Sequence, residues 1–136
     1  MKLFKLFLLV AVFTGGGWLR AAEFQLSTHV LDTSIGKPGP GVKVILEKKA
    51  TDGTWNKISE GVTNQDGRIT DFLERKGIGA NLGTYRLTFF LKEYFETRNQ
   101  TTVFPEAVVV FVISDETHYH IPLVVTPYAL STYRGS

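Results

Sequence analysis

Residues 84–91 read TYRLTFFL and residues 107–114 read AVVVFVIS. Both stretches are rich in the β-branched and aromatic residues that are enriched in strands. The second stretch is apolar along almost its whole length, which is typical of a strand that is covered on both faces. We therefore expect Thr84–Leu91 to form a strand and Ala107–Ser114 to form a central, buried one.

Further short β-rich segments lie on either side of these two. We predict strands at Phe24–Leu31, Val42–Lys48, Trp55–Val62, His118–Val125 and Tyr128–Tyr133. The stretches between them, among them SIGKPGPG at residues 34–41 and TNQDGR at residues 63–68, contain glycine, proline and Asp-Gly turn signals. One stretch, KEYFETR at residues 92–98, has helical character, and we expect its helix to cap the surface. This spacing indicates an all-β, antiparallel β-sandwich of seven or eight strands with one short helix.

Composition limits what such a domain can do. The 136 residues fit one domain, and 43% hydrophobic with 21% charged residues are globular values. The chain contains no cysteine, which excludes disulfides, a thiolate zinc site and a cysteine nucleophile. A formal net charge of +2 is too small to argue for a nucleic-acid partner.

The N-terminus differs from the rest of the chain. Two lysines within residues 1–5 precede the apolar run LFLLVAVF at residues 6–13, and the small residues Ala21 and Ala22 follow. This layout predicts a secretory signal peptide at residues 1–22, because a membrane-spanning helix needs about 20 apolar residues. The mature domain would then be residues 23–136, periplasmic or secreted, with no membrane contact after cleavage. Cleavage removes three of the 15 basic residues and none of the 13 acidic ones, which leaves a net charge of −1.

The three histidines of the chain are His29, His118 and His120. His118 and His120 are two positions apart on one predicted strand, so their side chains share a face, and His29 shares its face with Gln25 and Ser27. Imidazole exchanges protons near neutral pH, which suits acid–base catalysis. The same spacing is compatible with a zinc site of three histidines and with ordinary, half-exposed strand histidines. The histidines alone leave these three interpretations open.

Four segments taken together carry a resemblance. They are HVLDTSIGKP at residues 29–38, TNQDGR at 63–68, HYHIP at 118–122 and STYRGS at 131–136. The chain resembles the transthyretin-like family over residues 24–136, and within it the enzymatic branch that hydrolyses 5-hydroxyisourate. The terminal YRGS is similar to the signature of that branch, which hormone-carrying transthyretins lack.

This resemblance implies a β-sandwich that assembles as a homotetramer, a dimer of dimers, with active sites along a channel at the dimer–dimer interface. The implied small-molecule substrate is 5-hydroxyisourate, which is ring-opened to 2-oxo-4-hydroxy-4-carboxy-5-ureidoimidazoline in urate degradation. The implied reaction uses no metal and no organic cofactor. The matching positions give catalytic residues His29, Arg68, His120 and Ser136, and substrate-binding residues His29, Arg68, Tyr133 and His118.

The chemistry of these side chains suits a hydrolase. Neutral imidazoles at His29 and His120 can accept a proton from water, whereas the guanidinium of Arg68 stays charged and can bind a planar, oxygen-rich ring. Tyr133 can hold the ring by contact, and Ser136 offers a hydroxyl and the terminal carboxylate. Asp32 and Asp66 belong to the same motifs, and we interpret both as structural carboxylates. The alternatives are a non-enzymatic carrier of an aromatic molecule in the channel, and a zinc hydrolase that uses all three histidines.

Overall fold

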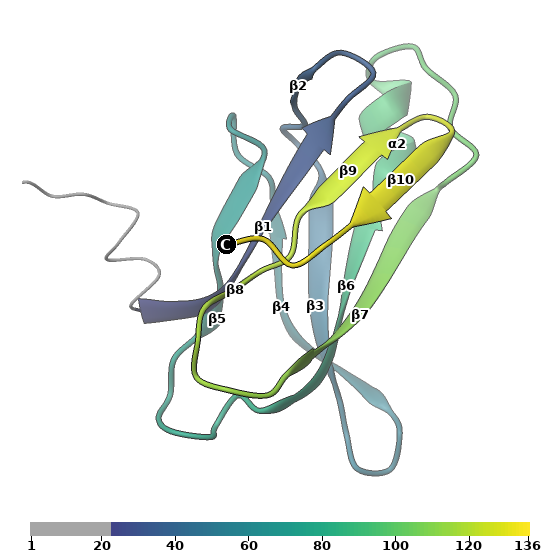
Figure 1. The fold of residues 1–136 in the computed structure, drawn as a ribbon. Coiled ribbons are helices and arrows are strands. Elements are labelled where there is room, and N and C mark those ends of the chain that lie inside the picture. The colour runs from purple at the N-terminus through teal and green to yellow at the C-terminus, as the bar shows by residue number, and fades with distance from the viewer. Residues whose placement is uncertain (1–22) are drawn as a thin grey trace, which may run out of the picture.

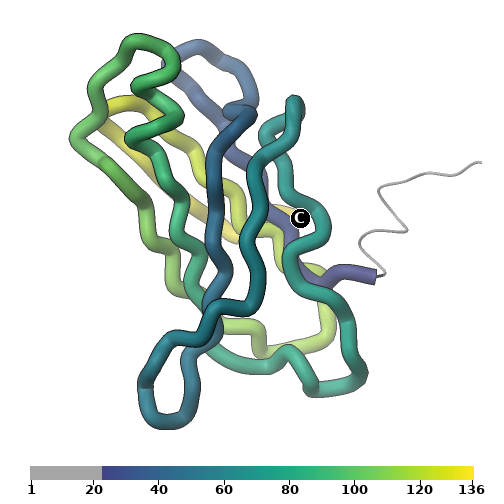
Figure 2. The backbone as a smooth tube through the Cα atoms, turned by 180° about the vertical axis from the view of Figure 1, so that it is seen from behind, coloured from purple at the N-terminus to yellow at the C-terminus, as the bar shows by residue number. Residues whose placement is uncertain are grey.

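The chain folds into two facing β-sheets, as seen in a computed structural model that describes residues 23–136. Figures 1 and 2 show the sheets from opposite sides, with the single labelled helix at one end of the sandwich. This architecture confirms the predicted all-β sandwich with one short helix. The predicted signal peptide lies outside the described residues. Within residues 23–136, no helix is long and apolar enough to cross a membrane.

The elements are short, as the turn signals predict. In chain order they are β1 (Phe24–Asp32), β2 (Lys37–Pro38), β3 (Lys43–Lys49), β4 (Trp55–Val62), β5 (Arg68–Glu74), β6 (Gly83–Phe90), α2 (Leu91–Glu96), β7 (Glu106–Ile113), β8 (Tyr119–His120), β9 (Leu123–Thr126) and β10 (Ala129–Thr132).

Strand β1 is the centre of the first sheet. It pairs antiparallel with β5 along one part of its length and with β2 near its C-terminal end. On its other edge it pairs in parallel with β8 and then with β9, and β10 continues the sheet beyond β9. The sandwich is therefore antiparallel apart from these two parallel pairings, which bring residues about ninety positions apart next to one another.

The second sheet has the order β4-β3-β6-β7 and packs its inner face against the first. The core between the sheets is apolar, and Leu46, Tyr85, Leu87 and Phe89 are almost completely buried. Because side chains alternate along a strand, the polar residues between these positions face solvent.

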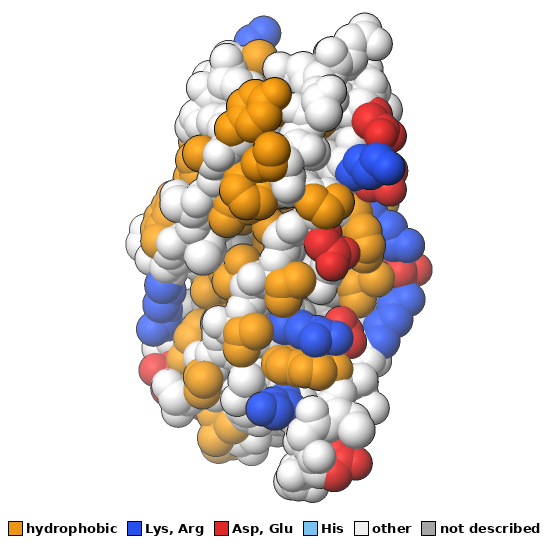
Figure 3. Space-filling model, turned by 90° about the vertical axis from the view of Figure 1, so that its right-hand side faces the viewer, with side chains coloured by type: hydrophobic (Ala, Val, Ile, Leu, Met, Phe, Trp, Pro, Cys, Tyr) orange, Lys and Arg blue, Asp and Glu red, His pale blue; other side chains and the backbone are white. Residues whose placement is uncertain are grey.

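Strand β7 corrects one prediction. We expected residues 107–114 to form a central strand buried on both faces, but β7 lies at the edge of its sheet and pairs with β6 alone. Its inner face contributes Ala107 and Ile113 to the core, whereas Val108, Val110 and Val112 are 52–57% exposed on the outer face. Figure 3 shows the side of the molecule on which β7 and β10 lie, with hydrophobic side chains gathered along it. The apolar run therefore reflects burial on one side and an uncovered apolar surface on the other.

Three smaller differences concern strand boundaries. Strand β5 was not among the predicted strands, and it starts at Arg68, the last residue of the TNQDGR segment. The predicted strand 118–125 is split into β8 and β9 at Ile121 and Pro122, since proline cannot donate to the ladder. Within the predicted turn 34–41, Lys37 and Pro38 pair with the end of β1.

The helix α2 is more than a surface cap. Leu91, Tyr94 and Phe95 are buried, so one face of the helix belongs to the core. The Tyr94 hydroxyl donates a hydrogen bond of 2.9 Å to Oδ2 of Asp32, a carboxylate with no exposed surface. The other oxygen of Asp32 accepts from the amide and hydroxyl of Ser34, so the carboxylate is fully satisfied, and it is structural as expected.

Candidate active site

Three neighbouring strands bring the predicted site residues together. His29 on β1 is the cross-strand partner of Arg68 on β5, and Ser27 on β1 is the partner of His120 on β8. Along β1 these positions alternate with the core residues Leu26 and Val30, so Ser27 and His29 project from the opposite face of the sheet. The sheet itself thus places two imidazoles and a guanidinium on one face.

The turn before β5 fixes the start of that strand. The Asn64 side-chain oxygen accepts hydrogen bonds from the amides of Asp66 and Arg68, at 2.9 and 3.0 Å. Gly67 has a φ of +71°, and a Cβ at this position would lie 2.5 Å from the Val30 carbonyl oxygen. Glycine is therefore required here, and the close approach holds Arg68 beside His29.

His29 presents an unpaired nitrogen. Its Nε2 atom is buried and has no hydrogen-bond partner among the described residues. Burial and, to a smaller extent, the Arg68 guanidinium lower the pKa of His29, against an opposing hydrogen bond to the Asp66 backbone. A buried polar atom without a partner costs stability, and such an atom beside a charged group marks a place where a ligand or water binds.

His120 is also held in the neutral state. Burial lowers the pKa of His120 to about 4, and the nearby Arg68, His29 and His118 act in the same direction. Its Nδ1 atom lies 2.8 Å from the Ser27 hydroxyl. Two neutral imidazoles beside one permanent cation can accept a proton near neutral pH, because neither is charged there.

His118 lies on the same face as His120, as the spacing predicts. Both of its ring nitrogens, however, have protein partners: Nε2 is 2.8 Å from the Ser27 hydroxyl and Nδ1 is 3.0 Å from the Phe24 carbonyl oxygen. With no nitrogen left for substrate, its geometry favours support of the site over the predicted substrate contact.

The C-terminal segment closes one side of the site. The Gly135 amide donates to the His120 carbonyl at 2.8 Å, and a Cβ at Gly135 would lie 2.5 Å from Cδ2 of His120. Arg134 stacks over the Tyr119 ring and donates to the Thr117 hydroxyl. Tyr133 is 57% exposed, and Ser136 follows as the last residue. The sequence predicted that Ser27 shares a face with His29 but gave it no role in the site, and it gave none to Gly135 within the YRGS motif.

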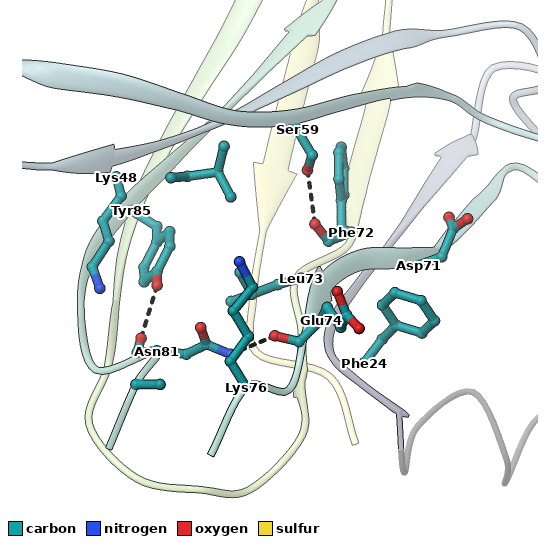
Figure 4. A pocket seen from close by; sticks show the side chains of 12 residues that line it. Phe24, Lys48, Ser59, Asp71, Phe72, Leu73, Glu74, Lys76, Asn81 and Tyr85 are labelled. Atoms are coloured by element: carbon teal, nitrogen blue, oxygen red, sulfur yellow. Dashed lines mark hydrogen bonds between the residues drawn. The ribbon is translucent and has the colours of Figure 1, made fainter. Parts of the chain in front are cut away.

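A separate cavity of about 410 Å³ opens between the sheets at β4 and β5 (Figure 4). Three of its polar side chains, those of Ser59, Asn81 and Tyr85, already have protein partners. Ser59 donates to the Phe72 carbonyl, Tyr85 to the Asn81 carbonyl, and Asn81 to Gln25 and the Glu74 carbonyl. None of the predicted site residues lines this cavity. Over residues 23–136, no cluster of three or more His, Cys, Asp or Glu residues could hold a metal ion.

Fold and site together define a class of protein, a two-sheet sandwich that places neutral imidazoles and a guanidinium on the outer face of one sheet. Residues 26–135 match the HIUase/Transthyretin family. The chain is 46% identical to the 5-hydroxyisourate hydrolase of Salmonella dublin over 119 residues, which cover 87% of this chain and 85% of that protein.

Solved structures agree with this match. The 5-hydroxyisourate hydrolase of Klebsiella pneumoniae superposes with a TM-score of 0.70 at 37% identity, covering 82% of this chain and 92% of that one. Sea bream transthyretin in complex with thyroxine superposes with a TM-score of 0.76 at 29% identity, covering 82% of this chain and 94% of that one. The chain belongs to the HIUase/transthyretin family.

Proposed function

We propose that this protein is a 5-hydroxyisourate hydrolase that acts in urate degradation and uses neither a metal nor an organic cofactor. The observation that carries the proposal is the pair of neutral imidazoles, His29 and His120, beside Arg68 on one sheet face. The relatives named as hydrolases support the same activity. The reaction opens the cyclic acyl–nitrogen bond of 5-hydroxyisourate to give 2-oxo-4-hydroxy-4-carboxy-5-ureidoimidazoline.

In the proposed reaction, the histidine pair transfers protons and Arg68 binds the substrate. One imidazole of the pair accepts a proton as the water oxygen bonds to the ring carbonyl carbon. The Arg68 guanidinium binds the oxygen-rich ring and stabilises the negative charge that develops on the carbonyl oxygen. The carbon–nitrogen bond then breaks, and the leaving nitrogen receives a proton from the imidazolium.

The C-terminal residues complete the site in this proposal. Tyr133 holds the substrate ring by contact, and Ser136 offers its hydroxyl. The anchoring of Gly135 on His120 supports this, because it fixes the chain end next to the catalytic ring.

The proposed assembly is a homotetramer, a dimer of dimers, in which each site lies at the dimer–dimer interface. The uncovered edge of β7 and its exposed valines support association between copies, since long apolar edges are rarely left open to solvent. Tyr133, two residues before the Gly135 that contacts His120, is exposed, which fits a face that a second copy covers. Light scattering of the purified protein tests the proposal, and a monomer of full activity would contradict it.

The proposed location is the periplasm or the exterior of the cell, with residues 1–22 removed as a signal peptide. The basic start and short apolar run support this. Export in a bacterial host followed by N-terminal sequencing would give a start near residue 23, whereas an intact N-terminus in the cytoplasm would contradict the proposal.

The alternative function is that of a non-enzymatic carrier of an aromatic small molecule. The structural similarity to sea bream transthyretin in complex with thyroxine is the observation that favours it. An enzyme and a carrier differ in stoichiometry. With 5-hydroxyisourate in hundredfold excess over protein, an enzyme speeds the ultraviolet decay of all the substrate, whereas a carrier protects or removes at most one equivalent per site.

The same assay after chelator treatment distinguishes our proposal from a zinc hydrolase. Our proposal expects the rate of hydrolysis to be unchanged, whereas a zinc hydrolase would lose activity.

A further inference from the structure

We propose that Ser27 is a positioning residue for the hydrolase reaction. Its hydroxyl links His118 to His120 and holds the His120 ring with the proton on Nδ1, which leaves Nε2 free to accept a proton from the attacking water. The inference rests on the proposed function for the reaction, but its statement about the His120 ring can be tested without substrate.

Ser27 is placed for this role by the sheet. Its hydroxyl lies 2.8 Å from Nε2 of His118 and 2.8 Å from Nδ1 of His120, so it bridges two imidazoles on the neighbouring strand. Ser27 is only 8% exposed, and it is the register partner of His120 in the parallel β1–β8 pair. A hydroxyl has one hydrogen to donate, so it cannot donate to both rings at once.

The Phe24 carbonyl sets the direction of the hydrogen bonds. A carbonyl oxygen can only accept, so Nδ1 of His118, 3.0 Å away, carries a hydrogen. In the neutral ring Nε2 of His118 is then an acceptor, and the Ser27 hydroxyl donates to it. The Ser27 oxygen is left to accept, and its remaining neighbour, Nδ1 of His120, must be the donor.

The opposite nitrogen of His120 is consequently the reactive one. With a hydrogen on Nδ1, the neutral ring carries its lone pair on Nε2, the nitrogen that the Ser27 hydroxyl does not contact. Gly135 packs against the Cδ2 edge of the ring and limits its rotation. The order of hydrogen bonds, from Phe24 through His118 and Ser27, thus selects one tautomer of the catalytic imidazole.

The direct test is nuclear magnetic resonance of the full protein with ¹⁵N-labelled histidine. Three histidines give a spectrum that single variants can assign. At neutral pH we expect a protonated Nδ1 and an unprotonated Nε2 for His120. The reverse tautomer in the wild-type protein, or rapid exchange between the two, would overturn the proposal without any activity measurement.

The kinetic test uses Ser27→Ala with Ser59→Ala as the matched control. Like Ser27, Ser59 donates one hydrogen bond from its hydroxyl, but it lies on β4 and donates to the Phe72 carbonyl, away from the histidines. We expect Ser27→Ala to lower kcat about 10- to 100-fold with little change in KM, and to give His120 a mixed tautomer signal. The control should keep the wild-type rate and tautomer. If Ser27→Ala keeps the wild-type kcat and His120 tautomer, the proposal fails and the hydrolase function stands; if wild type shows no hydrolysis, the proposed function fails separately.

Discussion

The neutrality of His120 is the residue-scale property on which catalysis depends. Its pKa is lowered to about 4, mainly by burial, whereas the unfolded chain titrates at about 6.5. Between these values the unfolded state binds a proton that the folded state does not, so the free energy of unfolding falls as the pH drops through this window. Above pH 6.5 this contribution is fully present.

A pH profile tests this property. Because an imidazole must be neutral to act as a base, we expect kcat/KM to stay high through pH 6 and to fall only on approach to about pH 4. Stopped-flow measurement of 5-hydroxyisourate loss, corrected for the rate in buffer at each pH, gives the profile. Half-maximal activity at pH 6.5, with the fold intact by circular dichroism, would show that the base is an unperturbed histidine.

The contact between Gly135 and His120 gives a second residue-scale prediction. In Gly135→Ala, the added Cβ would lie 2.5 Å from Cδ2 of the ring, so the ring or the chain end must move. We expect a loss of hydrolysis of roughly tenfold or more, since misplacement of a catalytic group by about 1 Å is costly. The thermal midpoint should change little because the site of change is at the chain terminus. Wild-type activity in this variant would mean that ring placement does not depend on Gly135.

Residue types and motifs predicted much of the site, since His29, Arg68 and His120 meet on one face as the resemblance implies. The role of Ser27 could not be predicted in the same way. Its hydroxyl meets two rings more than ninety residues away, and that contact exists only because β8 pairs in parallel with β1.

At the scale of elements, helix α2 is tied to β1 through a buried hydrogen bond. The Tyr94 hydroxyl donates to the fully buried Asp32, and burial followed by this carboxylate raises the pKa of Tyr94 to about 12. In Tyr94→Phe, the carboxylate loses one of its donors, and we expect a loss of about 1–3 kcal/mol in the free energy of unfolding. Urea denaturation checks this, with the exposed Tyr128→Phe as control. Equal stability of the two variants would show that the bond contributes nothing.

Two strands show where element prediction from sequence is limited. The alternation in β5 is interrupted by the exposed Asp71 and the buried Phe72, which concealed a strand that begins at Arg68. In β7 the apolar run was read as burial on both faces, but sequence alone cannot separate a covered strand from an edge strand whose outer valines lie open. Edge position depends on the topology of the sheet, which is a property of the whole chain.

At the scale of the whole molecule, the open β7 edge and the exposed Tyr133 suggest that copies of the chain associate, so specific activity should depend on protein concentration. If a second copy completes each site, specific activity should fall as the protein is diluted below the dissociation constant of the assembly. Light scattering and rate measurements over the same concentration range should then change together. Constant specific activity in a range where the protein is shown to be monomeric would contradict a shared site.

The hydrolase assignment itself is tested most directly by the rate of 5-hydroxyisourate loss, measured in the ultraviolet for wild type and for the double variant His29→Asn/His120→Asn. Matching circular dichroism and light scattering would establish that the variant keeps the fold and assembly. We predict that wild type turns over many equivalents of substrate per site, and that the variant decays at the rate of buffer. A wild-type rate equal to buffer, or a double variant as fast as wild type, would contradict the account.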